Sequence, residues 1–244
     1  MLIPIIIINL DDSIERWESL SKQLSHIGLN PIRLAGTLGC ALSEQDKSIW
    51  ANHKKNRKQH HRNLTDGEIG CYISHYRAWE KIVEDNISAC IVLEDDLNVD
   101  PGFTSAIETI ETLPKSWDLI KLYDGRPTPF YHSTPIDNEF SVGNYKTVPN
   151  GCQAYAVSLT GAKKLLARKP FFRPVDIDIQ FHSEIQLNVI GIKPYKIKVN
   201  REFESDIERV NKGRHSNHSS LMRNLKYRIN MFIERQKVSG KLPE

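Results

Sequence analysis

The sequence predicts an α/β fold: a single domain with a mixed, mostly parallel central sheet. The stretch "IPIIIINL" at 3–10 is continuously apolar and β-branched, as in a strand buried on both faces. Apolar residues then recur at helical spacing over 14–27, and "PIRLAG" at 31–36 begins a second strand. A strand, a helix and a second strand in this order are typical of parallel sheets, which bind ligands at the carboxyl ends of their strands.

Local signals place the remaining elements. Asp12 and Glu15 predict a capping box at the start of the first helix, and Gly28 predicts its end. Residues 43–63 are polar and lack periodicity, which predicts a long loop. Thr65 and Glu68 have capping-box spacing and begin a helix that is apolar on two sides, so that helix is expected to be buried. Further strands are expected at "ACIVL", "SWDLIKL" and "GCQAYAVS", with a surface excursion over 126–150 and a helix after "GCQAYAVS".

Composition sets wide limits. The 244 residues suit one domain with a full core, or a domain with a C-terminal elaboration, and the net charge of +3 is too small to indicate a partner. Four cysteines lie far apart without a CxxC pair, which indicates reduced thiols in a cytosolic protein rather than disulfides or a zinc site. The apolar N-terminus is short and lacks a basic region and a cleavage site, so neither a signal peptide nor a membrane span is expected.

Three carboxylates follow the strand "ACIVL" directly, at Glu94, Asp95 and Asp96. Side chains alternate along an extended chain, so Glu94 and Asp96 are expected on one side and Asp95 on the other. Two carboxylates about 4 Å apart repel by roughly 4 kcal/mol at an effective dielectric constant near 20. A divalent cation removes that cost, and oxygen ligands suit magnesium or manganese. The alternative is that one aspartate caps the next segment while the others are solvated.

Other candidate residues are placed by position. Asn9 and Leu10 end the first strand, at the edge where a parallel sheet binds ligands. Arg16, on the first turn of the following helix, could reach a phosphate there or could be a solvated arginine. His75 lies on the buried helix, either near a polar pocket or hydrogen-bonded within the core.

Asp176 and Asp178 form a second acidic pair, in "PVDIDIQF". In a strand the two side chains would share a side, and the alternation of Ile177, Ile179 and Phe181 favours a strand. On a helix they would diverge, and Asp176 could cap that helix. Both alternatives remain open from the sequence.

In order and spacing, the motifs resemble glycosyltransferase family 25, which contains bacterial lipooligosaccharide galactosyl- and glucosyltransferases and the collagen galactosyltransferases. They are "INL", Arg16, "GEIGCYISH", "VLEDD", "DLIKL", "QAYAVSLTGAKKLL", "PVDID" and "ESDI" at 204–207. The resemblance covers roughly residues 1–207, since boundaries taken from sequence are soft. The pair "GEIGCYISH" and "VLEDD" is its most specific part.

The resemblance implies a GT-A-type, Rossmann-like catalytic domain over 1–207, a UDP-sugar donor, and transfer with inversion. It also implies roles for individual residues. The metal, Mn²⁺ or Mg²⁺, would be held by Glu94, Asp96 and Asp206, although glutamate replaces the first aspartate of a strict D-x-D motif. The catalytic base would be Asp176, with Asp178 as the alternative. The residues expected to bind the donor are Asn9, Leu10, Arg16, His75, Glu94, Asp95 and Gln153.

The C-terminal residues 208–244 predict a basic amphipathic helical extension. Apolar residues share one side, at Leu221, Leu225, Ile229, Phe232 and Ile233. Such a helix suits an anionic inner-membrane surface, where a lipid-linked oligosaccharide acceptor would lie. Alternatively it docks on the catalytic domain or on a second subunit of a homodimer. No nucleic-acid-reading module accompanies it, so no nucleic-acid partner is expected.

These observations predict a cytoplasmic hexosyltransferase, peripherally associated with the inner membrane, that moves galactose rather than glucose to a lipooligosaccharide core. Two other classes of function remain as alternatives. One is a nucleotidyltransferase or nucleotide-sugar hydrolase that uses the same acidic site. The other is a non-catalytic protein that binds membrane or nucleic acid through the basic tail.

Overall fold

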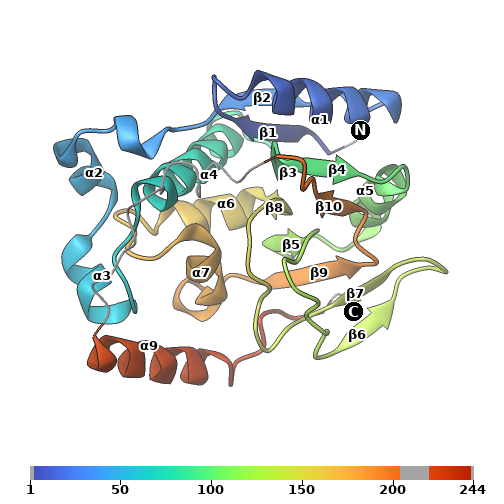
Figure 1. Ribbon diagram of the computed structural model, residues 1–244. Coiled ribbons are helices and arrows are strands. Elements are labelled where there is room, and N and C mark those ends of the chain that lie inside the picture. The colour runs from blue at the N-terminus through green and yellow to red at the C-terminus, as the bar shows by residue number, and fades with distance from the viewer. Residues whose placement is uncertain (1–2, 204–219, 243–244) are drawn as a thin grey trace.

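The computed structural model describes residues 3–203 and 220–242, and an eight-stranded sheet runs through its centre (Figure 1). The strand order across the sheet is β2-β1-β3-β8-β5-β9-β7-β6. The strands are β1 (Ile5–Asn9), β2 (Ile32–Ala35), β3 (Ala89–Glu94), β5 (Leu119–Lys121), β6 (Ser133–Pro135), β7 (Ser141–Gly143), β8 (Ala154–Ser158) and β9 (Val189–Lys193). A separate antiparallel pair joins β4 (Leu97–Val99) to β10 (Ile197–Val199).

The strand directions confirm the predicted mixed, mostly parallel sheet. β1 is parallel to both β2 and β3, and β5 is parallel to β9. β8 is antiparallel to both β3 and β5, while β7 is antiparallel to β9 and β6. Six of the eight strands therefore share one direction, and β8 and β7 run against it. Because β8 is reversed, its first residues lie at the edge where β1 and β3 end.

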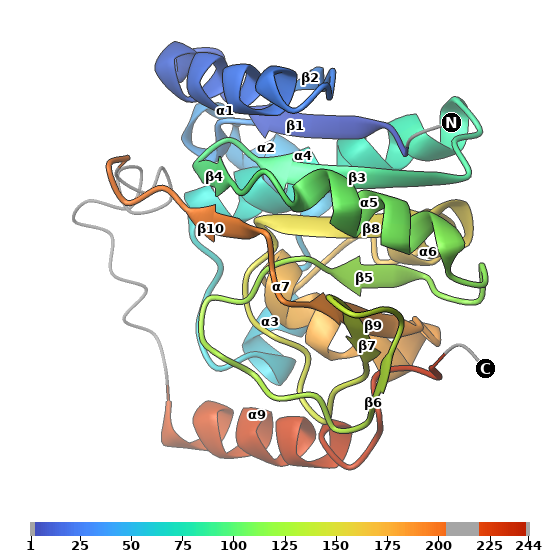
Figure 2. The same ribbon diagram turned by 90° about the vertical axis from the view of Figure 1, so that its right-hand side faces the viewer.

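Alternate side chains of β1 enter two separate cores. Ile5 and Ile7 pack with α1 (Ile14–His26) and α5 (Phe103–Thr112), whereas Ile6 and Ile8 pack with α4 (Asp66–Glu84) and α6 (Leu159–Leu166). The sheet is therefore the middle layer of three, and Figure 2 shows α5 and α4 on its opposite sides. This double burial explains the unbroken apolar sequence of the strand.

Helix α4 is buried along most of its length, as its sequence predicts. The Thr65 hydroxyl accepts a hydrogen bond from the Glu68 backbone N–H, and the Glu68 carboxylate accepts one from the Thr65 N–H, so the predicted capping box is present. Buried side chains on both sides of the helix include Tyr72, Trp79 and His75. The last of these is a polar group that needs a partner inside the protein.

Three local predictions were wrong or undecided. Helix α1 is preceded by Ser13 rather than by a capping Asp12, and no side chain caps it. Residues 43–63 form two short helices, α2 (Glu44–Trp50) and α3 (His53–Gln59), each capped by a side chain but too short to show periodicity. The acidic pair lies on a helix, α7 (Val175–Gln180), so its two carboxylates diverge.

The C-terminal helix α9 (Leu221–Glu234) docks on the α/β domain along the outer side of α3 (Figure 1). Arg223 donates hydrogen bonds to the His60 carbonyl and to the side chains of Asn56 and Asn63. At the other end, the buried Glu234 carboxylate accepts hydrogen bonds from the backbone and side chain of Ser183. Among the described residues, no helix is long and apolar enough to cross a lipid bilayer.

Candidate active site

The three carboxylates at the end of β3 have three different environments. Asp95 is buried and faces α1, where its Oδ1 lies 3.2 Å from the Arg16 guanidinium and its Oδ2 accepts a 2.7 Å hydrogen bond from Asn9. Glu94 faces the opposite way, toward His75 on α4. Neighbouring side chains therefore alternate as predicted, and Asp95 is already neutralised by a protein cation.

Asn9 positions Asp95 and uses all of its own polar groups to do so. Its amide nitrogen also donates to the Ser13 carbonyl at 2.8 Å, and its oxygen accepts from Arg33 at 2.7 Å. The side chain is 1% exposed and lies behind the neighbouring cavity rather than in its wall. Asn9, one of the predicted donor-binding residues, therefore orients Asp95 and does not face the cavity.

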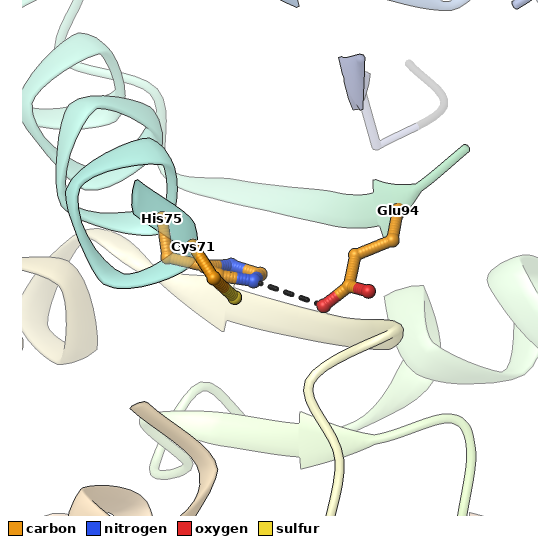
Figure 3. A group of neighbouring side chains, drawn as sticks. All are labelled: Cys71, His75 and Glu94. Carbon is orange, nitrogen blue, oxygen red and sulfur yellow. Dashed lines mark hydrogen bonds and ion pairs between the residues drawn. The ribbon is translucent and has the colours of Figure 1, made fainter. Parts of the chain in front are cut away.

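A chain of hydrogen bonds holds Glu94 from the other side. The Trp79 indole N–H donates to the Tyr155 hydroxyl at 2.9 Å, and that hydroxyl lies 2.9 Å from His75 Nδ1. His75 Nε2 lies 3.3 Å from Glu94 Oε1 (Figure 3). Trp79, Tyr155 and His75 are all buried, so the orientation of Glu94 is fixed from the core.

The donors in this chain assign the histidine tautomer. Indole can only donate, so the Tyr155 oxygen is the acceptor from Trp79. Within the described part of the chain, the acceptor for the tyrosine hydrogen is His75 Nδ1. Neutral His75 then carries its hydrogen on Nε2 and donates it to Glu94. His75 therefore positions Glu94. Both alternatives from the sequence hold, since His75 lies beside a polar cavity and is hydrogen-bonded within the core.

Asp96 is the carboxylate of the three that forms no salt bridge among the described residues. Its Oδ1 is buried without a hydrogen-bond partner among the residues that the structure describes. Burial, followed by the charges of Glu94 and Asp95, raises the pKa of Asp96 to about 7. A divalent cation would supply the missing charge, and Glu94 and Asp96 provide hard oxygen ligands for it. These two residues fit the expected metal, whereas the third expected ligand, Asp206, lies outside the described residues.

A cavity opens directly in front of the carboxylates. Its walls come from the ends of β1 and β2, from α4 and from the start of β8. The predicted residues Leu10, Arg16, His75, Glu94, Asp95, Asp96 and Gln153 all line it. This is the carboxyl edge of the parallel strands, where α/β sheets bind ligands. The structure therefore has a cavity at the edge where the sequence predicts ligand binding.

A second cavity adjoins the first and contains Asp176. Cys71, Glu94 and Gln153 line both cavities, so the two meet beside the β3 carboxylates. Asp176 Oδ2 accepts a 3.2 Å hydrogen bond from the Gly151 N–H. Gly151 has a φ of 84°, a backbone conformation that glycine adopts more readily than other residues. The buried Lys121 ammonium donates to the Gly151 carbonyl, and burial lowers the pKa of that lysine.

Asp178 lies elsewhere, in a buried network of ions. Its Oδ2 accepts a 2.6 Å hydrogen bond from the Tyr72 hydroxyl, and its Oδ1 lies 3.3 Å from Arg173 Nε. Arg168 is also in contact, with its Nε 3.5 Å from Oδ2. The side chain is 3% exposed and lines neither cavity. Of the two candidate bases, Asp176 alone faces the site.

Comparison with known proteins identifies the family of this site. The profile of glycosyltransferase family 25 (LPS biosynthesis protein) matches residues 2–179. The chain belongs to glycosyltransferase family 25. A glycosyltransferase 25 family member of Aedes aegypti is 33% identical over 184 residues, and procollagen galactosyltransferase 1-A of Xenopus laevis is 30% identical over 185. Each match covers 71% of this chain, but only 29% and 30% of those relatives.

Membership in family 25 does not by itself establish activity. The inactive glycosyltransferase 25 family member 3 of Homo sapiens is 35% identical over 123 residues, 48% of this chain and 20% of that protein. The chain therefore spans less than a third of these relatives, and one of them is named inactive.

Several residues of this family 25 site were missed from the sequence. His60 and His61 line the second cavity beside Asp176, from a segment expected to be a loop. The stretch from Gly36 to Gly39 lines the first cavity, where the Thr37 N–H donates to the Ser74 hydroxyl at 2.8 Å. Its glycines, close after a strand, were the available signal. No sequence signal pointed to His60 and His61, because their position beside the cavity depends on the packing of Tyr227 of α9 against their rings.

Proposed function

We propose that this chain is a metal-assisted, inverting glycosyltransferase. It moves a hexose, galactose rather than glucose, from a UDP-sugar to a hydroxyl of a lipooligosaccharide core. One observation carries the proposal: two adjoining cavities share Cys71, Glu94 and Gln153. The first contains a carboxylate pair for a cation, and the second contains the Asp176 carboxylate, which is held by backbone N–H groups. A transferase needs such paired cavities, because donor and acceptor must meet at one carbon atom.

The first cavity suits the donor. Glu94 and Asp96 would hold Mn²⁺ or Mg²⁺, which neutralises the charge that develops on the leaving diphosphate. The Trp79, Tyr155 and His75 chain keeps the Glu94 carboxylate in position, and Arg16 keeps Asp95 neutralised. The backbone of 36–39 and the side chain of Leu10 provide the wall for the nucleoside.

The second cavity suits the acceptor hydroxyl. Asp176 would remove the proton of that hydroxyl as it attacks, a step for which a placed carboxylate typically gives about 10²- to 10⁴-fold in rate. The Gly151 N–H and the Ile177 N–H, at 3.2 Å and 2.8 Å, hold its two oxygens in place. Because Asp178 is fully used by arginines and a tyrosine, it supports α7 and does not take the proton.

The outer side of α9 suits an anionic membrane. Six apolar side chains are exposed along it, with Leu221 91% and Met222 80% exposed. Lys226 lies on one flank of this apolar row, and Arg228 and Arg235 lie on the other. Apolar insertion between basic flanks is the pattern of an interfacial helix. We therefore place the enzyme on the cytoplasmic face of the inner membrane, near a lipid-linked acceptor; pairing with a second copy is the competing use of the row.

Transfer from UDP-[³H]galactose to lipooligosaccharide core, in Mn²⁺, tests the proposed function. UDP-glucose and UDP-N-acetyl sugars form the comparison panel. Asp96→Asn should abolish transfer while circular dichroism shows an intact fold, and the exposed Asp12→Asn variant should be unaffected. Near-normal turnover of Asp96→Asn would refute the metal assignment.

The same assay separates the rival activity. A nucleotide-sugar hydrolase would release free sugar at the same rate with or without acceptor. A nucleotidyltransferase would release pyrophosphate when UTP and a sugar 1-phosphate replace the UDP-sugar. The proposed transferase should instead show little donor turnover until the acceptor is added, since Asp176 activates a bound hydroxyl.

A further inference from the structure

A large groove continues the acceptor cavity toward α9. It has a volume of about 960 Å³, and Asn150 and Ile177 line both the groove and the cavity of Asp176. The loops at 125–128 and 147–150 form one wall, and α9 forms the other. The groove is thus the direct path from Asp176 to the surface that carries the exposed apolar row.

The α9 wall is fixed in place by specific contacts. Tyr227 packs against the rings of His60 and His61, with ring centroids 5.2 Å and 4.7 Å away. On the opposite wall, Gln180 donates to the Val148 carbonyl at 2.7 Å and also to the Asn150 side chain. Both walls therefore have a defined shape before any ligand binds, which lowers the cost of binding.

The charge of the groove is uniformly positive. Arg126 extends from one wall, and Arg228 and Arg235 extend from α9. No aspartate or glutamate is among the described residues that line the groove, and none of these three arginines has an ion pair within the described ranges. The nearest acidic side chain of α9, Glu234, is buried against Ser183 and lies 3.3 Å from Lys237.

We infer that this groove binds phosphate groups on the acceptor glycan, so that the enzyme prefers a phosphorylated acceptor. The inference rests on the proposed function for the position of the acceptor. A phosphate monoester offers three acceptor oxygens and up to two negative charges, so it can bind several guanidinium groups at once, whereas a carboxylate has two oxygens. Guanidinium also binds phosphate in a bidentate manner, which fixes the glycan's direction toward Asp176.

Binding to a delipidated glycan tests the inference without any transfer step. The probe is fluorescently labelled core oligosaccharide released from lipooligosaccharide by mild acid, used in its native form and after removal of phosphate with hydrogen fluoride. Fluorescence anisotropy should show that the native form binds at least about tenfold more tightly. Arg228→Gln and Arg235→Gln should each weaken native binding by about tenfold and leave the dephosphorylated form unchanged.

Lys226→Gln is the matched control. Lys226 lies on the same helix and on the other flank of the apolar row, and it does not line the groove. This variant should bind the soluble glycan as the wild type does, but should lose affinity for phosphatidylglycerol vesicles as Arg228→Gln does. That difference distinguishes phosphate on the glycan from phosphate on lipid headgroups.

The inference would be overturned by equal binding of both glycan forms, or by unchanged native binding by the arginine variants. Failure of the native glycan to bind would also overturn it. The binding assay contains no donor, so its result does not depend on transfer. If the chain lacked transferase activity, arginine-dependent binding of the glycan would still be observed, and the two proposals can therefore be refuted independently.

Discussion

The buried Asp96 carboxylate lowers the free energy of unfolding at neutral pH when no cation is bound to it. With its pKa raised to about 7, the protonated form is favoured in the folded protein over a range where the unfolded chain is already ionised. The free energy of unfolding therefore decreases as pH rises from about 4 to about 7, and this contribution is level above that. Asp96→Asn removes the effect, because the amide does not ionise.

The expected result is an inactive variant that is more stable than the wild type in EDTA at pH 8. The melting temperatures of the two proteins should converge as the pH is lowered toward 4. Melting curves across pH 4–8, with Asp12→Asn as the exposed control, measure this. A variant that melts below the wild type at pH 8 would show that Asp96 has a compensating partner.

Asp176 and Asp178 are two residues apart but have separate roles, so their amide variants should fail in different ways. Asp176→Asn should lose at least about 10²-fold in kcat with little change in stability, because the side chain is only half-buried and its amide oxygen can still accept from one of the two backbone N–H groups. Asp178→Asn should cost about 1.5–3 kcal/mol in the free energy of unfolding, because it leaves Glu184 as the one carboxylate paired with the buried Arg168 and Arg173 in the described structure. Urea denaturation and steady-state kinetics on both variants check this. Equal loss of activity and unchanged stability for both would contradict the assignment.

At the scale of elements, α4 organises the site. Its N-terminal turn is fixed by the Thr65 and Glu68 capping box, and its buried middle presents Cys71 and His75 to Glu94 (Figure 3). Burial, followed by the charge of Glu94, raises the pKa of the Cys71 thiol, so that thiol stays protonated beside the carboxylate. The helix therefore places an uncharged thiol where the two cavities meet.

Helix α9 is expected to control membrane association through its outward row. Leu221→Gln combined with Leu225→Gln should reduce sedimentation with phosphatidylglycerol vesicles by at least about tenfold, since each buried apolar side chain contributes about 1.5–3 kcal/mol. The double variant should keep wild-type activity on a soluble acceptor, because neither residue lines a cavity of the site.

Ile14→Gln is the matched control, since Ile14 is 61% exposed on α1, away from α9. It should leave vesicle binding unchanged. If the α9 double variant instead dissociates a dimer and still binds vesicles, the row is a subunit interface.

At the scale of the whole molecule, the reversed strand β8 completes the site. The Glu94 N–H donates to the Gln153 carbonyl at 2.8 Å, so the first residues of β8 lie directly beside the end of β3. The first cavity thus has walls from the N-terminal strands β1 to β3 and from the start of β8, about 60 positions further along the chain. Binding a nucleotide there should stabilise the whole fold rather than one segment.

UDP with Mn²⁺, at about 100 times its dissociation constant, should therefore raise the melting temperature by about 5–10 °C in a single transition. The shift should require both components, and it should disappear in Asp96→Asn. Differential scanning fluorimetry, with GDP as the nucleotide control, measures it. No shift with UDP and Mn²⁺ would show that the first cavity does not bind the donor.

Patterns within one segment determined much of this protein from the sequence alone. The double-sided strand at 3–10, the Thr65 cap and the carboxylates after "ACIVL" each depend on neighbours a few residues away, and so they could be predicted. The short helices at 44–59 and at 175–180 could not, because six or seven residues carry too little periodicity.

Only the tertiary structure decided which carboxylates are available. Asp95 is neutralised by an arginine 79 positions away, and Asp178 accepts a hydrogen bond from a tyrosine 106 positions away, whereas Asp96 and Asp176 have no cationic side chain bound to them in the described structure. The tertiary structure also turned the apolar row of α9 outward, because its Arg223 and Glu234 find buried polar partners on the domain. Long-range pairing of charges is set by packing, and a linear pattern does not encode it.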